Sequence, residues 1–207
     1  LNSRVRPAVG PGSRFEIDSP SAISAVRGTE LRVAFDREDT TSRVEVLKGG
    51  VAVSGQKKTR LIRSGFGTLI ESGTPPSPPI RLLPAPELEP LPEKIEQPSW
   101  PIRWQPLEGA GRYRMEVALS PEFTTFLWDR AVDAPRAALP GLPDGPYYAR
   151  VRGIASNGIE GLNTIAKLVL NIHPEPPIPL RPEDQGAVRG VAPELHWTAS
   201  SEAAKYR

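Results

Sequence analysis

Apolar and polar positions alternate with a period of two through residues 31–35, 43–46 and 113–119. This period is typical of strands with one buried face, and no window carries the apolar stripe of an amphipathic helix with caps at both ends. The pattern therefore predicts a mostly β protein. The side chains expected to point inward are Leu31, Val33, Phe35, Val44, Val46, Tyr113, Met115, Val117 and Leu119.

A glycine pair interrupts the alternation at residues 47–53, and the apolar period resumes directly after it. Glycine adopts positive φ without steric cost, so Gly49 and Gly50 suit the central positions of a two-residue turn. The segment is therefore predicted to be a tight β-hairpin.

Prolines divide the chain into segments. Ten of the 25 prolines lie in residues 74–101 and five in residues 174–182. Proline-rich stretches favour extended, semi-rigid spacers. We accordingly expect a β domain at 1–73, a spacer at 74–98, a second domain at 99–173, and the start of a further module at 174–207.

The last segment resembles part of the second domain. Trp104 and Tyr113 lie nine residues apart, and so do Trp197 and Tyr206, at an offset of 93. This spacing predicts two tandem modules, of which the second copy is truncated. Because so short a segment has little to bury, residues after about Pro182 are expected to be poorly packed or held by a neighbour.

Composition excludes several classes of protein. The 207 residues carry 26 basic and 24 acidic side chains, two histidines and no cysteine. The near-balance of charge lacks the basic excess that is typical of nucleic-acid-binding proteins. No apolar stretch is long enough to span a membrane. Residues 1–30 lack a signal-peptide pattern, so any export signal is expected upstream of Leu1.

The motifs of common enzymes and metal sites are not found in the sequence. There is no nucleophile elbow, no phosphate-binding P-loop and no His-Glu-x-x-His pair. His173 and His196 lie 23 residues apart, which is poor spacing for a metal site. We expect no catalytic residue, no metal and no cofactor.

Residues 15–33 resemble the signature of the FecR domain, an extracytoplasmic β module. The resemblance rests on a Ser-Pro-Ser-Ala turn followed by Val26-Arg27-Gly28-Thr29, and it extends to about Ile70. Read from the residues alone, Gly28 marks a bulge or a close backbone approach. Arg27 is then either a structural arginine that supports the bend or an arginine that faces a ligand.

Residues 99–173 resemble a fibronectin type III module. Trp104 takes the place of that family's second-strand tryptophan, and residues 142–152 that of its tyrosine corner. Two tyrosines compete for the corner. Burying Tyr147 also buries Ala149 and Val151, whereas burying Tyr148 would bury two arginines. We therefore expect Tyr147 inside, with Tyr148, Arg150 and Arg152 on the exposed face.

Exposed aromatic and arginine side chains are the usual anchors of binding surfaces. The binding candidates are Arg27, Trp128, Tyr148, Arg150 and Arg152. Strand parity around Trp128 is ambiguous, so this residue is either a core residue or an anchor.

The two resemblances together imply a non-enzymatic interaction or scaffold protein of the bacterial cell envelope, located in the periplasm. Its expected partner is an envelope protein or peptidoglycan, and neither nucleic acid nor a membrane span in this stretch is expected. Two alternatives stay open: a signal transducer of FecR type, and a module that binds peptidoglycan or carbohydrate. The sequence does not indicate the oligomeric state.

Overall fold

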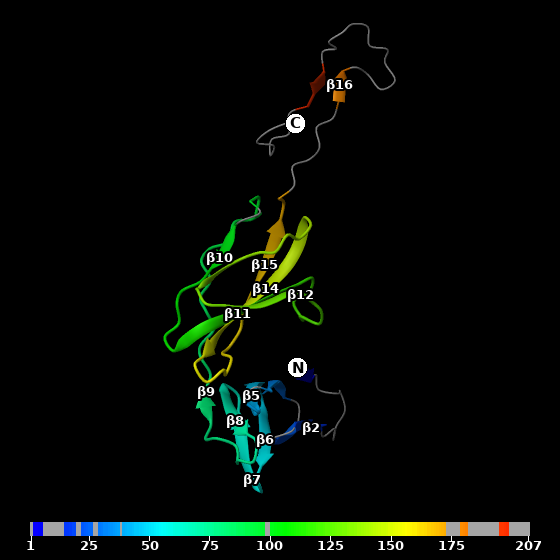
Figure 1. Cartoon of the computed structure of the whole chain (residues 1–207). Coiled ribbons are helices and arrows are strands. Elements are labelled where there is room, and N and C mark those ends of the chain that lie inside the picture. The colour runs from blue at the N-terminus through cyan, green and yellow to red at the C-terminus, as the bar shows by residue number, and fades with distance from the viewer. Residues whose placement is uncertain are drawn as a thin grey trace.

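A computed structural model describes residues 2–5, 15–19, 22–26, 29–37, 39–97, 100–172, 179–181 and 195–198. Within these ranges the protein is all β, with several antiparallel sheets and no helix. Two units follow one another along the chain, and Figure 1 shows the first unit (blue to cyan) below the second (green to yellow).

The first unit consists of two sheets that face each other. One sheet has the order β1-β4-β5-β8-β9, and the other has the order β2-β3-β6-β7. The strands are β1 (Asn2–Val5), β2 (Phe15–Ser19), β3 (Ala22–Val26), β4 (Glu30–Asp36), β5 (Thr41–Lys48), β6 (Gly50–Gly55), β7 (Lys58–Arg63), β8 (Phe66–Glu71) and β9 (Ile80–Arg81).

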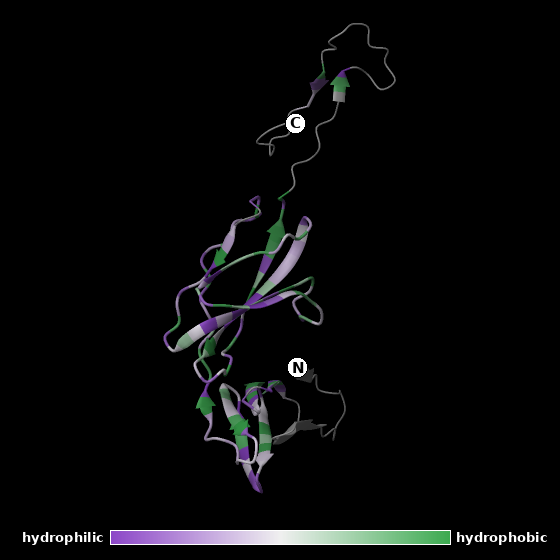
Figure 2. Cartoon of the chain, in the orientation of Figure 1, coloured by the Kyte–Doolittle hydropathy of each residue, from purple (hydrophilic) through white to green (hydrophobic). Residues whose placement is uncertain are grey.

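The core of this unit follows the predicted alternation. Hydrophobic and hydrophilic positions alternate along its strands (Figure 2). Both sheets contribute apolar side chains to one cluster, so the strands bury one face each. The cluster contains Leu31, Val33, Val44, Val46, Val51, Val53, Ile62 and Ile70.

The glycine pair at residues 49 and 50 is not a hairpin turn, contrary to the sequence prediction. β5 pairs with β4 and β8, whereas β6 pairs with β3 and β7. Gly49, at φ 79°, instead lets the chain pass from one sheet to the other. The true hairpin joins β6 to β7 through Gln56 and Lys57, which adopt φ of 46° and 59° without any glycine signal.

The second unit packs a four-stranded sheet, in the order β12-β11-β14-β15, against the pair β10-β13. Its strands are β10 (Pro101–Arg103), β11 (Ala110–Ala118), β12 (Phe126–Val132), β13 (Arg136–Ala138), β14 (Gly145–Ala155) and β15 (Thr164–Leu170). Trp104 and Tyr113 meet edge to face in the core, with ring centroids 5.3 Å apart. The predicted inward position Leu119 is instead 66% exposed, because β11 ends at Ala118.

The proline-rich stretch at 74–98, which we expected to be a semi-rigid spacer between the domains, contributes residues to both units. Ile80 and Arg81 form β9 and pair with β8 of the first unit. Ile95 is buried in the second core, where it bridges to Leu170. Short strands fit here because proline is tolerated at sheet edges and between paired residues.

Only two short segments of the predicted second copy, residues 179–181 and 195–198, are described. In the second unit Leu88 bridges to Trp104. Further along the chain, β16 (Pro179–Arg181) pairs with β17 (His196–Trp197), with Pro179 opposite Trp197. Trp197 is 44% exposed, whereas Trp104 is 2% exposed. Apart from residues 195–198, residues 182–207 lie outside the described ranges.

Candidate functional site: a buried charged joint

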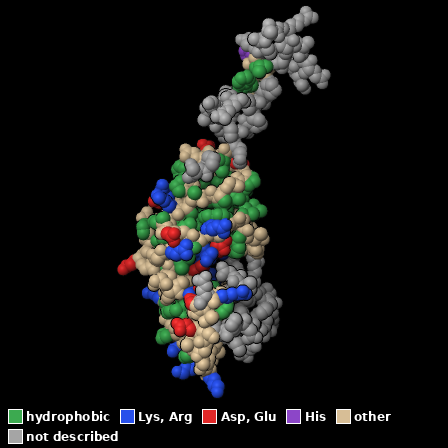
Figure 3. Space-filling model, viewed as in Figure 1, with side chains coloured by type: hydrophobic (Ala, Val, Ile, Leu, Met, Phe, Trp, Pro, Cys, Tyr) green, Lys and Arg blue, Asp and Glu red, His purple; other side chains and the backbone are tan. Residues whose placement is uncertain are grey.

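The two units meet at a turn of the second unit that lies against β4, β5 and β8 of the first. This turn, residues 157–163, connects β14 to β15. Ile159 is 2% exposed, and its side chain lies beside Gly67 of β8. Figure 3 shows basic and acidic side chains intermingled at this level of the molecule. We call the region the joint.

Two glycines shape the turn. Gly158 has φ 80°, and a Cβ at this position would lie 2.5 Å from Nε of Arg43. Its absence lets the Arg43 guanidinium reach the Asn157 carbonyl oxygen at 3.0 Å. At Gly161 a Cβ would lie 2.8 Å from the Leu83 carbonyl oxygen. Both glycines thus allow a close approach that any side chain would block.

Among the described residues of the first unit, Arg32 of β4 makes the most hydrogen bonds to the second unit. Its guanidinium donates to the carbonyl oxygens of Glu160 and Gly161 at 2.7 and 2.6 Å, and to Oδ1 of Asn163 at 3.1 Å. Its Nε lies 3.5 Å from Glu45 Oε2 but has no hydrogen-bond partner among the described residues. Because burial disfavours the charged form, the pKa of Arg32 is lowered.

Glu45 of β5 completes the contact from the first unit. Its Oε1 accepts a hydrogen bond from the backbone N–H of Glu160 at 3.1 Å. The carboxyl group is almost fully buried, and burial outweighs the attraction of Arg32, so its pKa is raised. Glu45 and Arg32 together satisfy both the N–H and the C=O of Glu160.

The second unit contributes a charged network on the outer face of β11 and β14. Register places Glu116 opposite Arg150, and Arg114 opposite Arg152. Glu116 accepts two hydrogen bonds from Arg152 at 2.9 Å and also pairs with Arg150. The Arg150 guanidinium lies 4.2 Å from the centroid of the Phe123 ring, which is a cation–π contact.

Glu160 forms ion pairs with both Arg114 and Arg152, which lie opposite each other on neighbouring strands. Its two carboxylate oxygens pair separately with Arg114, at 2.7 Å, and with Arg152. Burial opposes its ionisation, but Arg152, Arg32 and Arg114 prevail and lower its pKa to about 2. The pKa of Glu116 is lowered in the same way, against burial, by Arg152 and Arg150.

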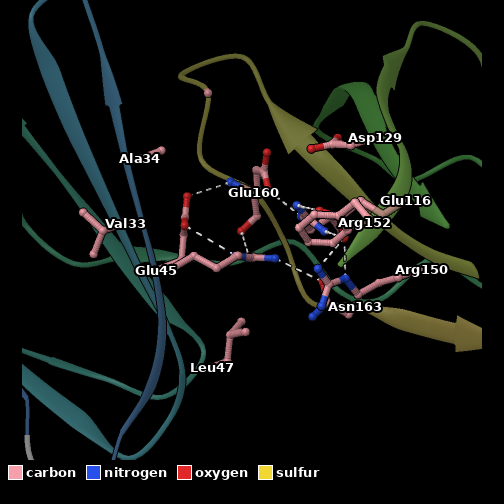
Figure 4. A pocket seen from close by; sticks show the side chains of 13 residues that line it. Val33, Ala34, Glu45, Leu47, Glu116, Asp129, Arg150, Arg152, Glu160 and Asn163 are labelled. Atoms are coloured by element: carbon pink, nitrogen blue, oxygen red, sulfur yellow. Dashed lines mark hydrogen bonds and ion pairs between the residues drawn. The ribbon is translucent and has the colours of Figure 1, made fainter. Parts of the chain in front are cut away.

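The charges balance in the ion-pair network that connects Arg32 to β11, β12 and β14. Four guanidinium groups and four carboxylates take part in it, and all of them except that of Arg114 line a cavity of about 240 Å³ (Figure 4). Balanced, mutually hydrogen-bonded charges fix one geometry, since each group left without its partner would remain buried and charged. These residues are Arg32, Arg114, Arg150, Arg152, Glu45, Glu116, Asp129 and Glu160.

Two predicted binding residues are corrected by this network. Arg150 and Arg152 were expected on an exposed face, but they are 4% and 2% exposed. Parity placed them correctly on the face opposite Tyr147. Phe123 packs on Arg150, both arginines line a cavity shared with Arg32 and Glu45 of the first unit, and Glu116 and Glu160 supply the carboxylates that neutralise the buried charges.

The structure also places the other predicted residues. Tyr147 is buried, as parity predicts, and its hydroxyl donates to the Pro143 carbonyl oxygen at 2.8 Å. Tyr148 is half-buried. Trp128 packs on the core, while Phe126 lies on the opposite face near Arg150, because the register of β11 and β12 shifts between Val117 and Ala118.

The Val26 to Thr29 segment is described in part. Val26 ends β3, and the buried Thr29 donates from Oγ1 to the Gly50 carbonyl oxygen at 2.8 Å, which ties the segment to the sheet-changing turn. Arg27 and Gly28 lie outside the described residues. Within the described ranges no group of three His, Asp or Glu side chains gathers to hold a metal ion. No helix in those ranges is long and apolar enough to cross a membrane.

Sequence reasoning missed Arg32, Glu45, Glu116 and Glu160. One signal was present: residues 114–116 and 150–152 both carry charges at alternate positions, with arginine and glutamate among them. Two paired strands with opposite charges on one face indicate a cross-strand ion-pair network. The contribution of the first unit had no such signal, because it depends on how the units meet.

Comparison with known proteins identifies the N-terminal part of the first unit. The fold and the site define an all-β protein with two antiparallel units that meet at a buried charged joint. Residues 3–52 match the family described as FecR protein, and the chain thus carries a FecR domain at its N-terminus. The match begins nearer the N-terminus than the predicted 15–70 and ends before β7.

Two solved structures are similar to the chain at low identity. Both are crystal structures of the extracellular domain of BT4673 from B. thetaiotaomicron, described in one as a hybrid two-component system and in the other as a one-component system. Each has 9% identity and a TM-score of 0.25, and the match covers 82% of this chain and 31% of that one. The chain thus spans about a third of the length of these proteins. No curated protein matches it.

Proposed function

We propose that the protein is a non-enzymatic interaction or scaffold protein of the bacterial cell envelope, in which a FecR domain and fibronectin-like modules are held in a fixed arrangement. The joint carries this proposal. Arg32 and Glu45 of the first unit form hydrogen bonds with the backbone of Glu160, which lies in a turn of the second unit. A fixed arrangement lets the outer faces of the modules contact a partner at a set distance.

The path of residues 74–98 supports a fixed arrangement over a bending one. The backbone N–H of Leu162 donates to the Leu83 carbonyl oxygen at 2.9 Å, in addition to the pairing of β9 and Ile95. A signal transducer that changes the angle between its units would have to break the hydrogen bonds of Arg32, Arg43 and Glu45 to the turn at residues 157–163. The alternative of a FecR-type transducer is therefore less favoured.

Several features support a fibronectin type III-like assignment of the second unit. The strand order β12-β11-β14-β15 opposite β10-β13 is that of an antiparallel sandwich. Trp104 fills the core, and the Tyr147 hydroxyl bonds the backbone four residues upstream, as in a tyrosine corner. An envelope location is supported by the FecR domain, since proteins of that family belong to the envelope.

The experiment measures the distance between the units. The 207 residues contain no cysteine, so Glu71→Cys and Glu93→Cys, at exposed positions in the first and second units, give two unique labelling sites. Pulsed electron paramagnetic resonance should give one narrow distance distribution, unchanged by envelope extract. A broad distribution, or one that shifts with extract, would favour the transducer.

A second candidate, binding of peptidoglycan or another carbohydrate, is favoured by one site. Trp100 is 36% exposed in a cleft of about 350 Å³ that also contains Glu89, Gln97 and Arg103. An aromatic face flanked by carboxylate, carboxamide and guanidinium groups suits a sugar ring. Sedimentation with purified sacculi, lost in Trp100→Ala and kept in Glu108→Ala, would support this function. Protein that stays in the supernatant would remove it.

A further inference from the structure

We propose that the free edge of β7 binds an acidic, extended segment of a partner protein, which adds to the sheet as a further strand. This inference rests on the proposed role as an interaction protein and names the kind of partner. β7 is the last strand in the order β2-β3-β6-β7. Within the described part of the chain, β7 pairs only with β6, so its other edge has no strand beside it.

The hairpin geometry identifies the backbone groups at this edge. Gly55 pairs with Lys58 across the two-residue turn, and a pair that closes such a turn is hydrogen-bonded. In an antiparallel ladder hydrogen-bonded and non-hydrogen-bonded pairs alternate. The N–H and C=O groups of Thr59, Leu61 and Arg63 therefore point away from β6, toward the free edge.

The edge is uniformly basic. Residues 46–70 contain five basic side chains and no acidic one. Four of the five, Lys57, Lys58, Arg60 and Arg63, are exposed on β7 or its turn. Figure 3 shows basic side chains at the lower end of the molecule, where Figure 1 places β7. Such a field attracts an acidic segment and steers its approach.

The same charges argue against a second copy of this chain. Pairing of two β7 edges would bring like charges opposite one another, which is destabilising, and lysine on an edge strand is a common protection against such pairing. An acidic strand would be attracted to the basic side chains of β7 and not repelled by them. Carboxylates on one face of that strand lie beside Lys58 and Arg60, and its backbone pairs with Thr59, Leu61 and Arg63.

A phospholipid surface fits this edge less well. Anionic headgroups would satisfy the basic side chains, but they offer no ladder of donors and acceptors to the outward backbone groups. Leu61, which is 59% exposed between Arg60 and Ile62, gives an added strand an apolar contact as well. The geometry therefore favours a peptide over a membrane.

The test uses an eight-residue peptide of alternating glutamate and valine, fluorescently labelled and blocked at both ends, with the full 207-residue chain. Fluorescence anisotropy should show saturable binding that weakens at least tenfold when the salt concentration rises from 50 to 500 mM. Salt screens the attraction between exposed charges, because the Debye length falls from about 30 Å at 0.01 M to about 3 Å at 1 M. The same peptide with alternate backbone nitrogens methylated should bind at least tenfold more weakly, because it cannot pair with an edge strand.

Variants place the site on β7. The double variant Lys58→Glu and Arg63→Glu should weaken binding at least tenfold, whereas Lys94→Glu, an exposed charge in the second unit, should leave it unchanged. Circular dichroism of each variant checks that it is folded. The N-methylated peptide needs no variant, so the test stands even if the double variant fails to fold.

Three outcomes would overturn the inference. Equal binding of the methylated and unmethylated peptides would reduce the site to a charged patch. Equal loss with Lys94→Glu would place binding elsewhere. Tight binding to phosphatidylglycerol vesicles with none to the peptide would make the edge a membrane contact. Each outcome leaves the distance measurement between the units untouched, so failure here is distinguishable from failure of the proposed scaffold function.

Discussion

Glu45 on β5 accepts a hydrogen bond at 3.1 Å from the backbone N–H of Glu160, a residue 115 positions further along the chain. The carbonyl oxygen of the same residue accepts from Arg32. One peptide position of the second unit is thus held from both sides by neighbouring strands of the FecR domain. The carboxylate of Glu160 meanwhile serves its own unit by pairing with Arg114 and Arg152.

Replacing Arg32 should uncouple the units. Arg32→Ala removes three hydrogen bonds, leaves two carbonyl oxygens without this donor, and leaves Glu45 without its ion-pair partner. Loss of a buried charged partner costs about 3–5 kcal/mol. Calorimetry should show a lower melting temperature or two separated transitions. Arg112→Ala breaks only the exposed pair with Asp133 and should change stability by less than about 1 kcal/mol.

Acid should weaken the joint through Glu160. Its folded-state pKa, about 2, lies below the ordinary 4.5, so the stability it contributes is full above pH 4.5 and is lost as the pH falls toward 2. The shift corresponds to roughly 3 kcal/mol. Glu160→Gln should therefore be less stable than the parent at pH 7, and the gap should close near pH 2. A constant gap across this range, in urea unfolding at each pH, would contradict the assignment.

Glu45 should behave in the opposite sense. Its pKa is raised by burial, so its ionised form opposes the folded state above the folded-state pKa, and protonation relieves this as the pH falls toward 4.5. Glu45→Gln keeps an oxygen for the Glu160 N–H and removes the buried charge. Its free energy of unfolding, relative to the parent, should rise between pH 4.5 and pH 8. Glu45→Ala, which leaves the N–H unpaired, should instead be destabilised at both pH values by about 1–3 kcal/mol.

Glu116 should be indispensable to the second unit. It is 2% exposed and neutralises two arginines that are buried beside it. Glu116→Ala leaves both without this partner, and we expect a loss of about 3–5 kcal/mol in the free energy of unfolding. Asp133→Ala, at a position 83% exposed in its side chain, is the matched control. Equal effects of the two variants in urea unfolding would show that the network adds no stability.

The Tyr147 hydroxyl should stabilise the second unit by the value of one buried hydrogen bond. Tyr147→Phe removes the donor to Pro143 and should cost about 0.5–1.5 kcal/mol. Tyr148→Phe, one residue along on the other face, should cost much less because its side chain is only half-buried. The comparison of the two melting temperatures tests the tyrosine corner. Equal losses would place the corner elsewhere.

How far the sequence predicts the structure depends on the range of the interactions. The period of two identified β5, β11 and the inward position of Tyr147, because strand alternation is a local property. It misjudged Gly49 and Gly50, since a glycine turn between two apolar strands looks the same whether the strands share a sheet or face each other. Burial of Arg150 and Arg152 depends on partners up to 36 residues away and on the first unit.

The candidate site was the least predictable part. Arg32 and Glu45 lie on a strand pair whose pattern reads as an ordinary half-exposed surface, with polar residues between buried valines. The neighbouring sequence does not distinguish an arginine that faces solvent from one that forms hydrogen bonds with a turn far along the chain. Prolines likewise indicated where regular structure thins out, but not that Ile80 and Ile95 would be taken into the two flanking units.

The placement of β9 bears on how this chain can be divided. A fragment ending at residue 73, where the proline-rich stretch begins, would lack the strand that lies along β8 and would leave the Phe66–Gly67 edge bare. A fragment beginning at residue 99 would lose Ile95 and leave a hole in the second core. Expression boundaries drawn at the prolines would therefore damage both halves, and a cut between residues 82 and 87 would preserve the two sets of strands.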